Sequence, residues 1–319
     1  MDAPRIVFMG TPDFAVPSLD ALVGADLRPV AVVTVPDKPA GRGQRLQTSA
    51  VKRAAERHGL PVLQPESLRD PAFQGDLAAL RPDVLAVVAF RILPPEVYET
   101  ARLGAFNLHG SLLPAYRGAA PIQRALMDGV EETGVTTFFL QRTVDTGDVV
   151  LRRRIAVGPD DTAGDVHDRL AALGAEAVVE TVRRIAAGEA YAEPQDDTLA
   201  SPAPKIFRDD ARLDWSRSAR DVHNHVRALS PYPGAWTEWA PAPGAEPETL
   251  KVLRTRLAEV DRQLAGRPGE VAAADGRLVV ACGEGAVEVL EVQREGKRRM
   301  AAADFLNGAD LAPGTAFGA

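Results

Sequence analysis

Short apolar runs alternate with mixed, helix-like segments through the first part of the chain. Runs rich in Val, Ile and Leu without polar alternation predict strands that are buried on both faces of a parallel sheet. These predicted strands are residues 5–9, 30–35, 61–63, 84–90, 105–108, 134–140 and 149–157. The segments between them predict helices at 14–23, 49–58, 71–80, 120–127 and 162–187. This alternation predicts an α/β fold with a Rossmann-like, doubly wound, mostly parallel sheet.

The pattern changes beyond this part. Residues 189–206 are polar and contain several prolines, which predicts a linker. A helix is expected at 219–229, and short strands are expected at 235–239, 250–257, 269–273, 277–282 and 286–293. Short strands separated by glycine turns are typical of a small, OB-like antiparallel β-barrel. We therefore expect a first domain at 1–188 and a second domain at 207–319.

The composition is typical of a soluble globular protein, and we expect it in the cytoplasm. The chain has 319 residues, of which 45% are hydrophobic and 25% are charged. No apolar run reaches the roughly 18 residues of a membrane span, and no signal peptide precedes the first strand. The single cysteine, Cys282, excludes an internal disulfide and fits a reducing compartment. The five histidines form no metal-ligand pattern. His223 and His225 have the spacing of two strand-borne ligands, but they lie in a predicted helix where the two side chains diverge, so we expect no metal.

The net charge of −7 disfavours a nucleic-acid partner for the chain as a whole, but basic segments are present. Residues 36–53 contain five cations and the single anion Asp37. The cations are Lys38, Arg42, Arg45, Lys52 and Arg53. A glycine- and proline-rich loop of this charge predicts contact with a phosphate backbone, and a solvated surface loop is the alternative. A second basic group is Lys297, Arg298 and Arg299.

A polar group follows the predicted strand at 105–108. Asn107 and His109 lie two positions apart, so a strand places both on one face. They stand at the carboxyl end of a strand, where open α/β sheets bind ligands. The turn at Asp145 could return a carboxylate to the same edge. The alternatives are structural: a turn cap, a buried core histidine and an Asx-turn.

Together these three side chains suit the attack of an amine on an acyl carbon. Asn107 would donate to the oxyanion. His109 would take the proton of the amine or, as an imidazolium, stabilise the oxyanion. Asp145, accepting a hydrogen bond from the imidazole, would fix its tautomer and raise its pKa. Ser111 is a weaker candidate nucleophile, because the G-x-S-x-G elbow is absent. Only one glycine follows the first strand, so the G-x-G-x-x-G fingerprint of NAD binding is also absent.

Motifs spread along the chain carry a resemblance to a known family. They are residues 8–17 (FMGTPDFAVP), 38–43 (KPAGRG), 107–114 (NLHGSLLP), 116–122 (YRGAAPI), 132–136 (ETGVT) and 145–148 (DTGD). With these motifs the chain resembles the methionyl-tRNA formyltransferases, a branch of the enzymes that use 10-formyltetrahydrofolate. The resemblance implies the formyltransferase fold along essentially the whole chain.

The resemblance also implies roles for individual residues. Asn107, His109 and Asp145 would be catalytic. The folate pocket would be bordered by Phe90, Arg91, Ile92, Leu93, Ser111, Leu112, Leu113 and Pro114. Contacts with tRNA would come from Lys38, Arg42, Arg45, Lys297, Arg298 and Arg299. The implied reaction is attack of the amine of methionyl-initiator tRNA on the formyl carbon of 10-formyltetrahydrofolate. We expect a monomer with no membrane partner.

Other functions stay open at this point. Formyl transfer to a small amine, such as an amino sugar nucleotide, would use the same three side chains, and so would hydrolysis of the formyl-folate. A folate- or RNA-binding protein without catalysis is a further alternative. The three polar groups disfavour it, because polar groups gathered in a pocket without function cost stability.

Overall fold

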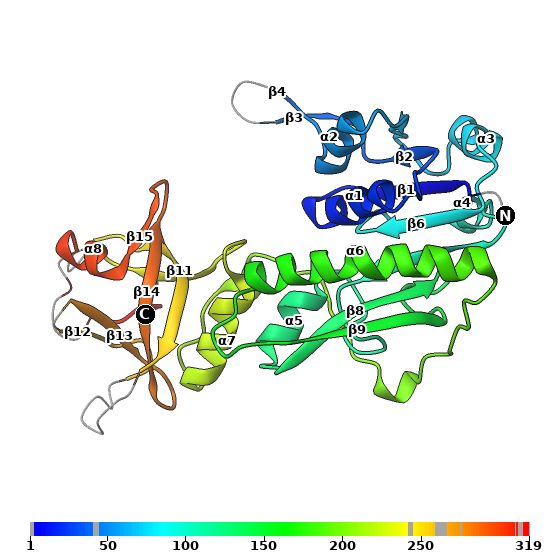
Figure 1. Ribbon diagram of the computed structural model, residues 1–319. Helices are drawn as coiled ribbons and strands as arrows, with labels where there is room; N and C mark the ends of the chain where they lie inside the picture. Colours follow the sequence, from blue (N-terminus) through cyan, green and yellow to red (C-terminus); the bar gives the residue numbers. More distant parts are fainter. Residues whose placement is uncertain are drawn as a thin grey trace. The chain divides into compact units, whose positions relative to one another are not determined.

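Figure 1 shows a computed structural model of the protein, which describes residues 3–40, 45–241, 245–258, 267–274, 276–309, 311 and 315–318. The chain forms two compact units. The first unit comprises Met1–Pro121, Glu132–Ala156 and His167–Ala203. The second unit comprises Ile122–Glu131, Val157–Val166 and Pro204–Ala319. Each unit is therefore assembled from separate stretches of sequence.

The first unit contains a seven-stranded sheet in the order β5-β2-β1-β6-β7-β8-β9. Its strands are β1 (Ile6–Gly10), β2 (Ala31–Val33), β5 (Val62–Leu63), β6 (Val84–Val88), β7 (Gly104–His109), β8 (Glu132–Phe139) and β9 (Val149–Ala156). The strands from β5 to β7 pair in parallel, whereas β8 and β9 are antiparallel to their neighbours. The predicted doubly wound, mostly parallel sheet is confirmed.

Helices connect and cover these strands (Figure 1). They are α1 (Val16–Gly24), α2 (Ala50–Arg57), α3 (Pro71–Ala79), α4 (Pro95–Tyr98) and α6 (Ala163–Ala187). α5 (Pro121–Met127) follows β7 along the chain and belongs, from Ile122 on, to the second unit. Ser49 and Asp70 cap α2 and α3 by accepting hydrogen bonds from backbone N–H groups of the first turn. At the start of α6, Thr162 and Asp165 form a reciprocal capping box.

The two faces of the sheet pack against different helices. Odd-numbered side chains such as Leu85 of β6 and Ala105 of β7 share a core with α3 and α4. On the opposite face Leu108 lies against Gly174 of α6, where an added Cβ would lie 2.6 Å from the leucine. Because side chains alternate along a strand, Asn107 and His109 point to the same side as Ala105. The predicted strand is confirmed, and β7 contains both residues.

Residues 38–40 and 45–47 are strands, where the composition of the segment 36–46 predicts a loop. β3 (Lys38–Ala40) and β4 (Arg45–Gln47) form an antiparallel ladder that pairs Lys38 with Gln47. Asp37, at the start of the ladder, accepts hydrogen bonds from Lys52 and Gln64, and the bond from Lys52 lowers the pKa of this carboxyl group. Lys52 is therefore bound to Asp37. Arg42, the cation implied to contact tRNA, lies outside the described residues.

The second unit is built on an antiparallel sheet in the order β10-β11-β14-β13-β12, with β15 added beside β14. The strands are β10 (Ala235–Trp239), β11 (Glu248–Leu257), β12 (Val271–Ala274), β13 (Arg277–Ala281), β14 (Ala286–Arg294) and β15 (Arg299–Ala301). Two helices, α7 (Ala219–Leu229) and α8 (Ala302–Asn307), share one hydrophobic core with this sheet. The predicted antiparallel C-terminal domain is confirmed, although β15 and α8 were not predicted.

Residues 189–203, most of the predicted linker 189–206, belong to the first unit and hydrogen-bond within it. Glu193 exchanges two backbone hydrogen bonds with Val149. Further along, the N–H of Arg117 donates to the carbonyl of Ser201, and the N–H of Ala203 donates to the carbonyl of Arg117. This segment therefore runs beside the loop that follows β7. In the described part of the chain, no helix is long and apolar enough to cross a membrane.

Glu288 of β14 is the centre of an ion-pair network in the second unit. Its side chain is only 7% exposed, and it accepts hydrogen bonds from Arg256 and Arg277 at 3.0 Å. The bond from Arg277 is the largest of the effects that lower the pKa of Glu288. Because the folded state lowers this pKa, the pair stabilises the fold above the unfolded-state pKa, and the stabilisation is lost as the pH falls through the folded-state value.

We expect Glu288→Gln to lower the free energy of unfolding by about 1–3 kcal/mol at neutral pH. The difference from the wild type should shrink as the pH falls below about 4.5. Denaturant unfolding of the wild type and the variant from neutral pH to below pH 4.5 would measure this difference in the free energy of unfolding. Glu291→Gln is the matched control, since Glu291 lies on the same strand with a 27% exposed side chain and a looser ion pair to Arg299. Equal losses in the two variants would contradict the prediction.

Candidate active site

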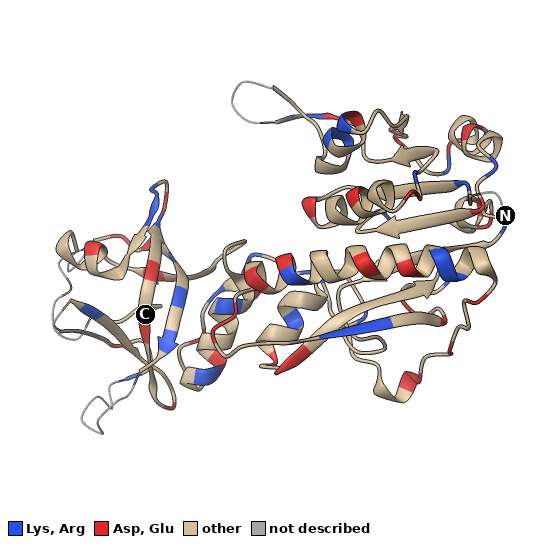
Figure 2. Ribbon diagram, viewed as in Figure 1, with Lys and Arg blue, Asp and Glu red and all other residues tan. Residues whose placement is uncertain are grey.

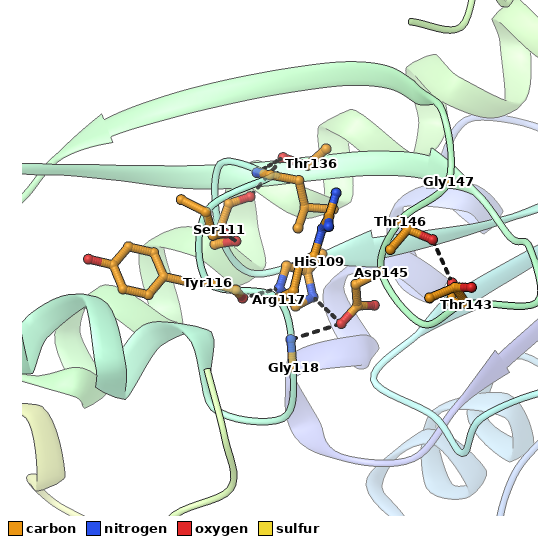
Figure 3. Close-up of polar contacts among 12 residues, drawn as sticks. His109, Ser111, Tyr116, Arg117, Gly118, Thr136, Thr143, Asp145, Thr146 and Gly147 are labelled. Carbon is orange, nitrogen blue, oxygen red and sulfur yellow. Dashed lines mark hydrogen bonds and ion pairs between the residues drawn. The ribbon is translucent and has the colours of Figure 1, made fainter. Parts of the chain in front are cut away.

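The site lies at the carboxyl end of β7 (Figure 3). β7 pairs in parallel with β6, with Leu108 opposite Val88, and in antiparallel with β8, with His109 opposite Thr136. The sheet order runs from β1 to β2 in one direction and from β1 to β6 in the other, so the carboxyl ends of β1 and β6 form a topological switch point. The segments that follow β6 and β7 leave the sheet beside each other at this edge.

His109 is buried and its two ring nitrogens face different groups (Figure 3). Nε2 lies 2.8 Å from the carbonyl oxygen of Tyr116, and Nδ1 lies 3.9 Å from Oδ2 of Asp145. A carbonyl oxygen can only accept, so Nε2 carries a proton in this arrangement. In the neutral ring the lone pair is therefore on Nδ1, on the side of the carboxylate.

The structure brings His109 and Asp145 together but corrects the expected contact between them. At 3.9 Å the carboxylate is too far from Nδ1 for a hydrogen bond. The Tyr116 carbonyl selects the tautomer instead. The Asp145 carboxylate accepts a hydrogen bond of 2.9 Å from the N–H of Gly118, which holds it beside the ring. From this position it can stabilise an imidazolium electrostatically.

The turn that carries Asp145 has an unusual backbone. Asp145 itself has a φ of 57°, in the left-handed region that aspartate tolerates better than most residues. At Gly147, two residues later, an added Cβ would lie 1.7 Å from the carbonyl oxygen of Phe139. The sequence Asp-Thr-Gly therefore allows the turn to close directly against the end of β8.

The segment that follows His109 is fixed by internal hydrogen bonds (Figure 3). The hydroxyl of Thr136 donates to the carbonyl of Ser111 at 2.7 Å and accepts from the N–H of Leu113 at 3.0 Å. The hydroxyl of Ser111 donates to the carbonyl of Ala115, and the residue is fully buried. A buried hydroxyl already committed as a donor is a poor nucleophile, which disfavours the role considered for Ser111.

Of the other residues in this segment, Leu113 is also buried and packs against Phe138 and Val149. Leu112 and Pro114 are partly exposed. Ser111 and Leu113 therefore shape the segment from inside, while Leu112 and Pro114 reach its surface.

The residues after β6 also divide into buried side chains and side chains that reach the surface. Leu93 is buried and Phe90 is partly buried in the core that includes α3 and α4. Arg91 donates hydrogen bonds to the carbonyls of Pro65 and Glu66, so its side chain ties two loops together. Ile92 is 75% exposed. Ile92 is therefore the most accessible apolar side chain of the predicted folate pocket.

The residues implied to contact tRNA belong to both units. Lys38 is exposed on β3, and Arg45 begins β4. Lys297, Arg298 and Arg299 are exposed at the turn between β14 and β15 (Figure 2). Arg299 lies 3.6 Å from Glu291, so one of these three charges is partly offset.

Sequence reasoning missed several groups of the site. The carbonyl of Tyr116 and the N–H of Gly118 are main-chain atoms, and no residue type marks them. The side chain of Gln195 donates to the carbonyls of Asp145 and Gly147, although its segment has the composition of a linker. Among the described residues, no three His, Cys, Asp or Glu side chains are grouped so as to hold a metal ion.

Comparison with known proteins identifies the family. Residues 4–182 match the formyl transferase family, and residues 205–310 match the formyl transferase C-terminal domain. A methionyl-tRNA formyltransferase of Chlorobium luteolum is 50% identical over 308 residues, which are 95% of this chain and 96% of the relative. One of Porphyromonas gingivalis is 46% identical over 95% of both chains. The chain belongs to the methionyl-tRNA formyltransferase family.

Solved structures share the fold of this formyltransferase. HypX of Aquifex aeolicus, in complex with tetrahydrofolic acid, matches with a TM-score of 0.65 over 98% of this chain and 49% of that chain. The N-formyltransferase of Helicobacter canadensis, in complex with folinic acid and dTDP-3-aminofucose, matches with a TM-score of 0.66 over 91% and 99%. Their sequence identities of 19% and 17% support a common fold alone.

Proposed function

We propose that this formyltransferase transfers the formyl group of 10-formyltetrahydrofolate to the α-amino group of methionyl-initiator tRNA. It would act as a monomer in the cytoplasm, where the product starts translation. The observation that carries the proposal is the pairing of His109 with Asp145 at the carboxyl edge of the sheet. The pair occurs in a chain that is 43–50% identical to methionyl-tRNA formyltransferases over nearly its whole length.

Three side chains divide the work of the reaction. The carboxamide of Asn107 donates to the formyl oxygen as it gains negative charge during attack by the amine. Nδ1 of His109 takes the proton that the amine loses, and the Asp145 carboxylate stabilises the resulting imidazolium. His109 then returns this proton to N10 of the folate as the bond between N10 and the formyl carbon breaks. The products are the formylated amine and tetrahydrofolate.

The formyl donor would lie between the segments 90–93 and 111–114. These segments leave the neighbouring strands β6 and β7 beside His109. The exposed side chain of Ile92 suits contact with the flat ring system of a folate. Ser111 and Leu113 would support the pocket from below, because their side chains are buried.

The second unit offers features suited to RNA. A cavity of about 580 Å³ is lined by aromatic and cationic side chains, among them Phe207, Arg208, Trp236, Lys251 and Arg294. Phe207 and Tyr232 at this cavity are 64% and 80% exposed. Exposed aromatic rings beside cations are typical of surfaces on which unpaired bases stack. This surface supports a tRNA acceptor over a small amine.

A competition assay tests the proposal. The protein is given labelled 10-formyltetrahydrofolate with initiator methionyl-tRNA, free methionine and an amino sugar nucleotide. We expect label on the charged tRNA alone, at a rate that falls steeply with salt because phosphate contacts are screened. Release of labelled formate, or label on a small amine, would overturn the proposed acceptor.

A further inference from the structure

Gln195 joins the two loops that surround the His109–Asp145 pair. Its Nε2 donates to the carbonyl oxygens of Asp145 at 3.0 Å and Gly147 at 2.8 Å. Its Oε1 accepts from Nε and Nη2 of Arg117 at 3.1 and 2.8 Å. Both ends of the carboxamide are therefore engaged, one with the turn of Asp145 and the other with the loop after β7.

These two loops provide the groups that face the imidazole of His109. The turn of Asp145 supplies the carboxylate. The loop after β7 supplies the Tyr116 carbonyl on Nε2 and the Gly118 N–H on the carboxylate. Arg117, which Gln195 binds, stands between these two residues. Gln195 thus fixes the spacing between the Asp145 carboxylate and the Tyr116 carbonyl, the two groups that face the imidazole.

The turn of Asp145 has little other support from side chains of the core. Residues 141–144 are exposed, and Thr146 hydrogen-bonds within the turn, to the carbonyl of Thr143 and the amide of Gln141. The positive φ of Asp145 is also a conformation that surrounding contacts must maintain. Two hydrogen bonds from Gln195 to this turn meet that need.

We propose that Gln195 is a positioning residue that holds the Asp145 carboxylate at its working distance from His109. The inference rests on the proposed function, because it assumes that Asp145 acts in formyl transfer. Gln195 acts through the turn and takes no part in the proton transfer itself. Small displacements of a catalytic group are costly, since a shift of about 1 Å can reduce a rate by about 10²-fold.

Gln195→Glu tests the proposal with little change of shape. Glutamate can still pair with Arg117, but it has no N–H for the two carbonyls and places an oxygen against them. We expect kcat to fall by about 10- to 100-fold with KM for the folate and the tRNA changed less than about twofold. Asp197→Asn is the control, because Asp197 is the exposed partner of Arg117 and does not bind the turn. This variant should keep the wild-type kcat.

A double variant separates positioning from a general structural role. In an Asp145→Asn background the charge that Gln195 positions is already absent, so adding Gln195→Glu should cost less than about twofold in kcat. Multiplication of the two losses would overturn the inference, as would a wild-type kcat for Gln195→Glu alone. A wild-type kcat for Asp145→Asn alone would instead show that the proposed function of Asp145 is wrong.

Discussion

Asp145→Asn should lower kcat of formyl transfer by about 10²- to 10⁴-fold without unfolding the protein. The change removes the charge that faces Nδ1 of His109 and retains an oxygen that can accept from the N–H of Gly118. The same N–H orients the new amide with its oxygen toward the ring, because an amide nitrogen in that place would oppose another donor. The fall in kcat therefore measures how much the charge of the Asp145 carboxylate stabilises the imidazolium.

Single-turnover formylation at saturating tRNA would measure this loss, and thermal unfolding would verify the fold. Asp148→Asn is the matched control, since it makes the same chemical change three residues further on at an exposed side chain. This control should retain the wild-type rate. A rate for Asp145→Asn within about threefold of the control would remove the carboxylate from the mechanism.

His109→Gln should also reduce kcat by about 10²- to 10⁴-fold. Nε2 of glutamine can replace the ring Nε2 as a donor to the Tyr116 carbonyl, so the loop after β7 keeps this contact. The glutamine side chain cannot take the proton of the attacking amine. We therefore expect turnover to be lost while binding of the folate, measured by fluorescence quenching or calorimetry, changes little.

The control for this variant is another imidazole paired with a carboxylate. His58 lies 2.6 Å from Oδ1 of Asp20, and His58→Gln should leave turnover unchanged. If His109→Gln kept more than about a tenth of the wild-type rate, the ring would not be the general base. Loss of folate binding together with turnover would instead assign His109 to the pocket.

The hydrophobic pattern of the sequence predicts the regular strands and helices of the fold. The buried runs of β1 and β6 lie within a residue or two of their predicted bounds, and α7 begins and ends at the residues expected. β1 and β6 are buried at every position and leave continuous apolar runs, whereas α7 buries one face and leaves a helical period. The ladder of β3 and β4 has no such period, because glycine, proline and cations dominate its composition.

The short elements β15 and α8 escaped prediction for a different reason. They are three and six residues long, and neither is long enough to show a period of its own. Both lie against β14, with which β15 pairs. Their structure depends on that neighbour rather than on local preference.

The sequence predicts the parts of the site that are built from side chains of distinctive chemistry. It does not predict the parts that are built from main-chain atoms. The two-residue spacing of Asn107 and His109 placed both on one face before the fold was known. The expected hydrogen bond from His109 to Asp145 was wrong because the Tyr116 carbonyl selects the tautomer. Gln195 lies 50 residues from Asp145 in sequence, and a lone glutamine in a polar segment carries no signal of its contacts.

The interleaving of the two units has a consequence for synthesis on the ribosome. Residues 122–131 and 157–166 belong to the second unit, yet they precede the bulk of it, 204–319, along the chain. Met127 packs against the core of that unit, and Arg227 donates to the carbonyls of Gly158 and Asp161. The nascent chain must therefore carry these early segments unpaired until its last third has emerged. A chain that ended at residue 203 would therefore leave Met127 of α5 without the core against which it packs.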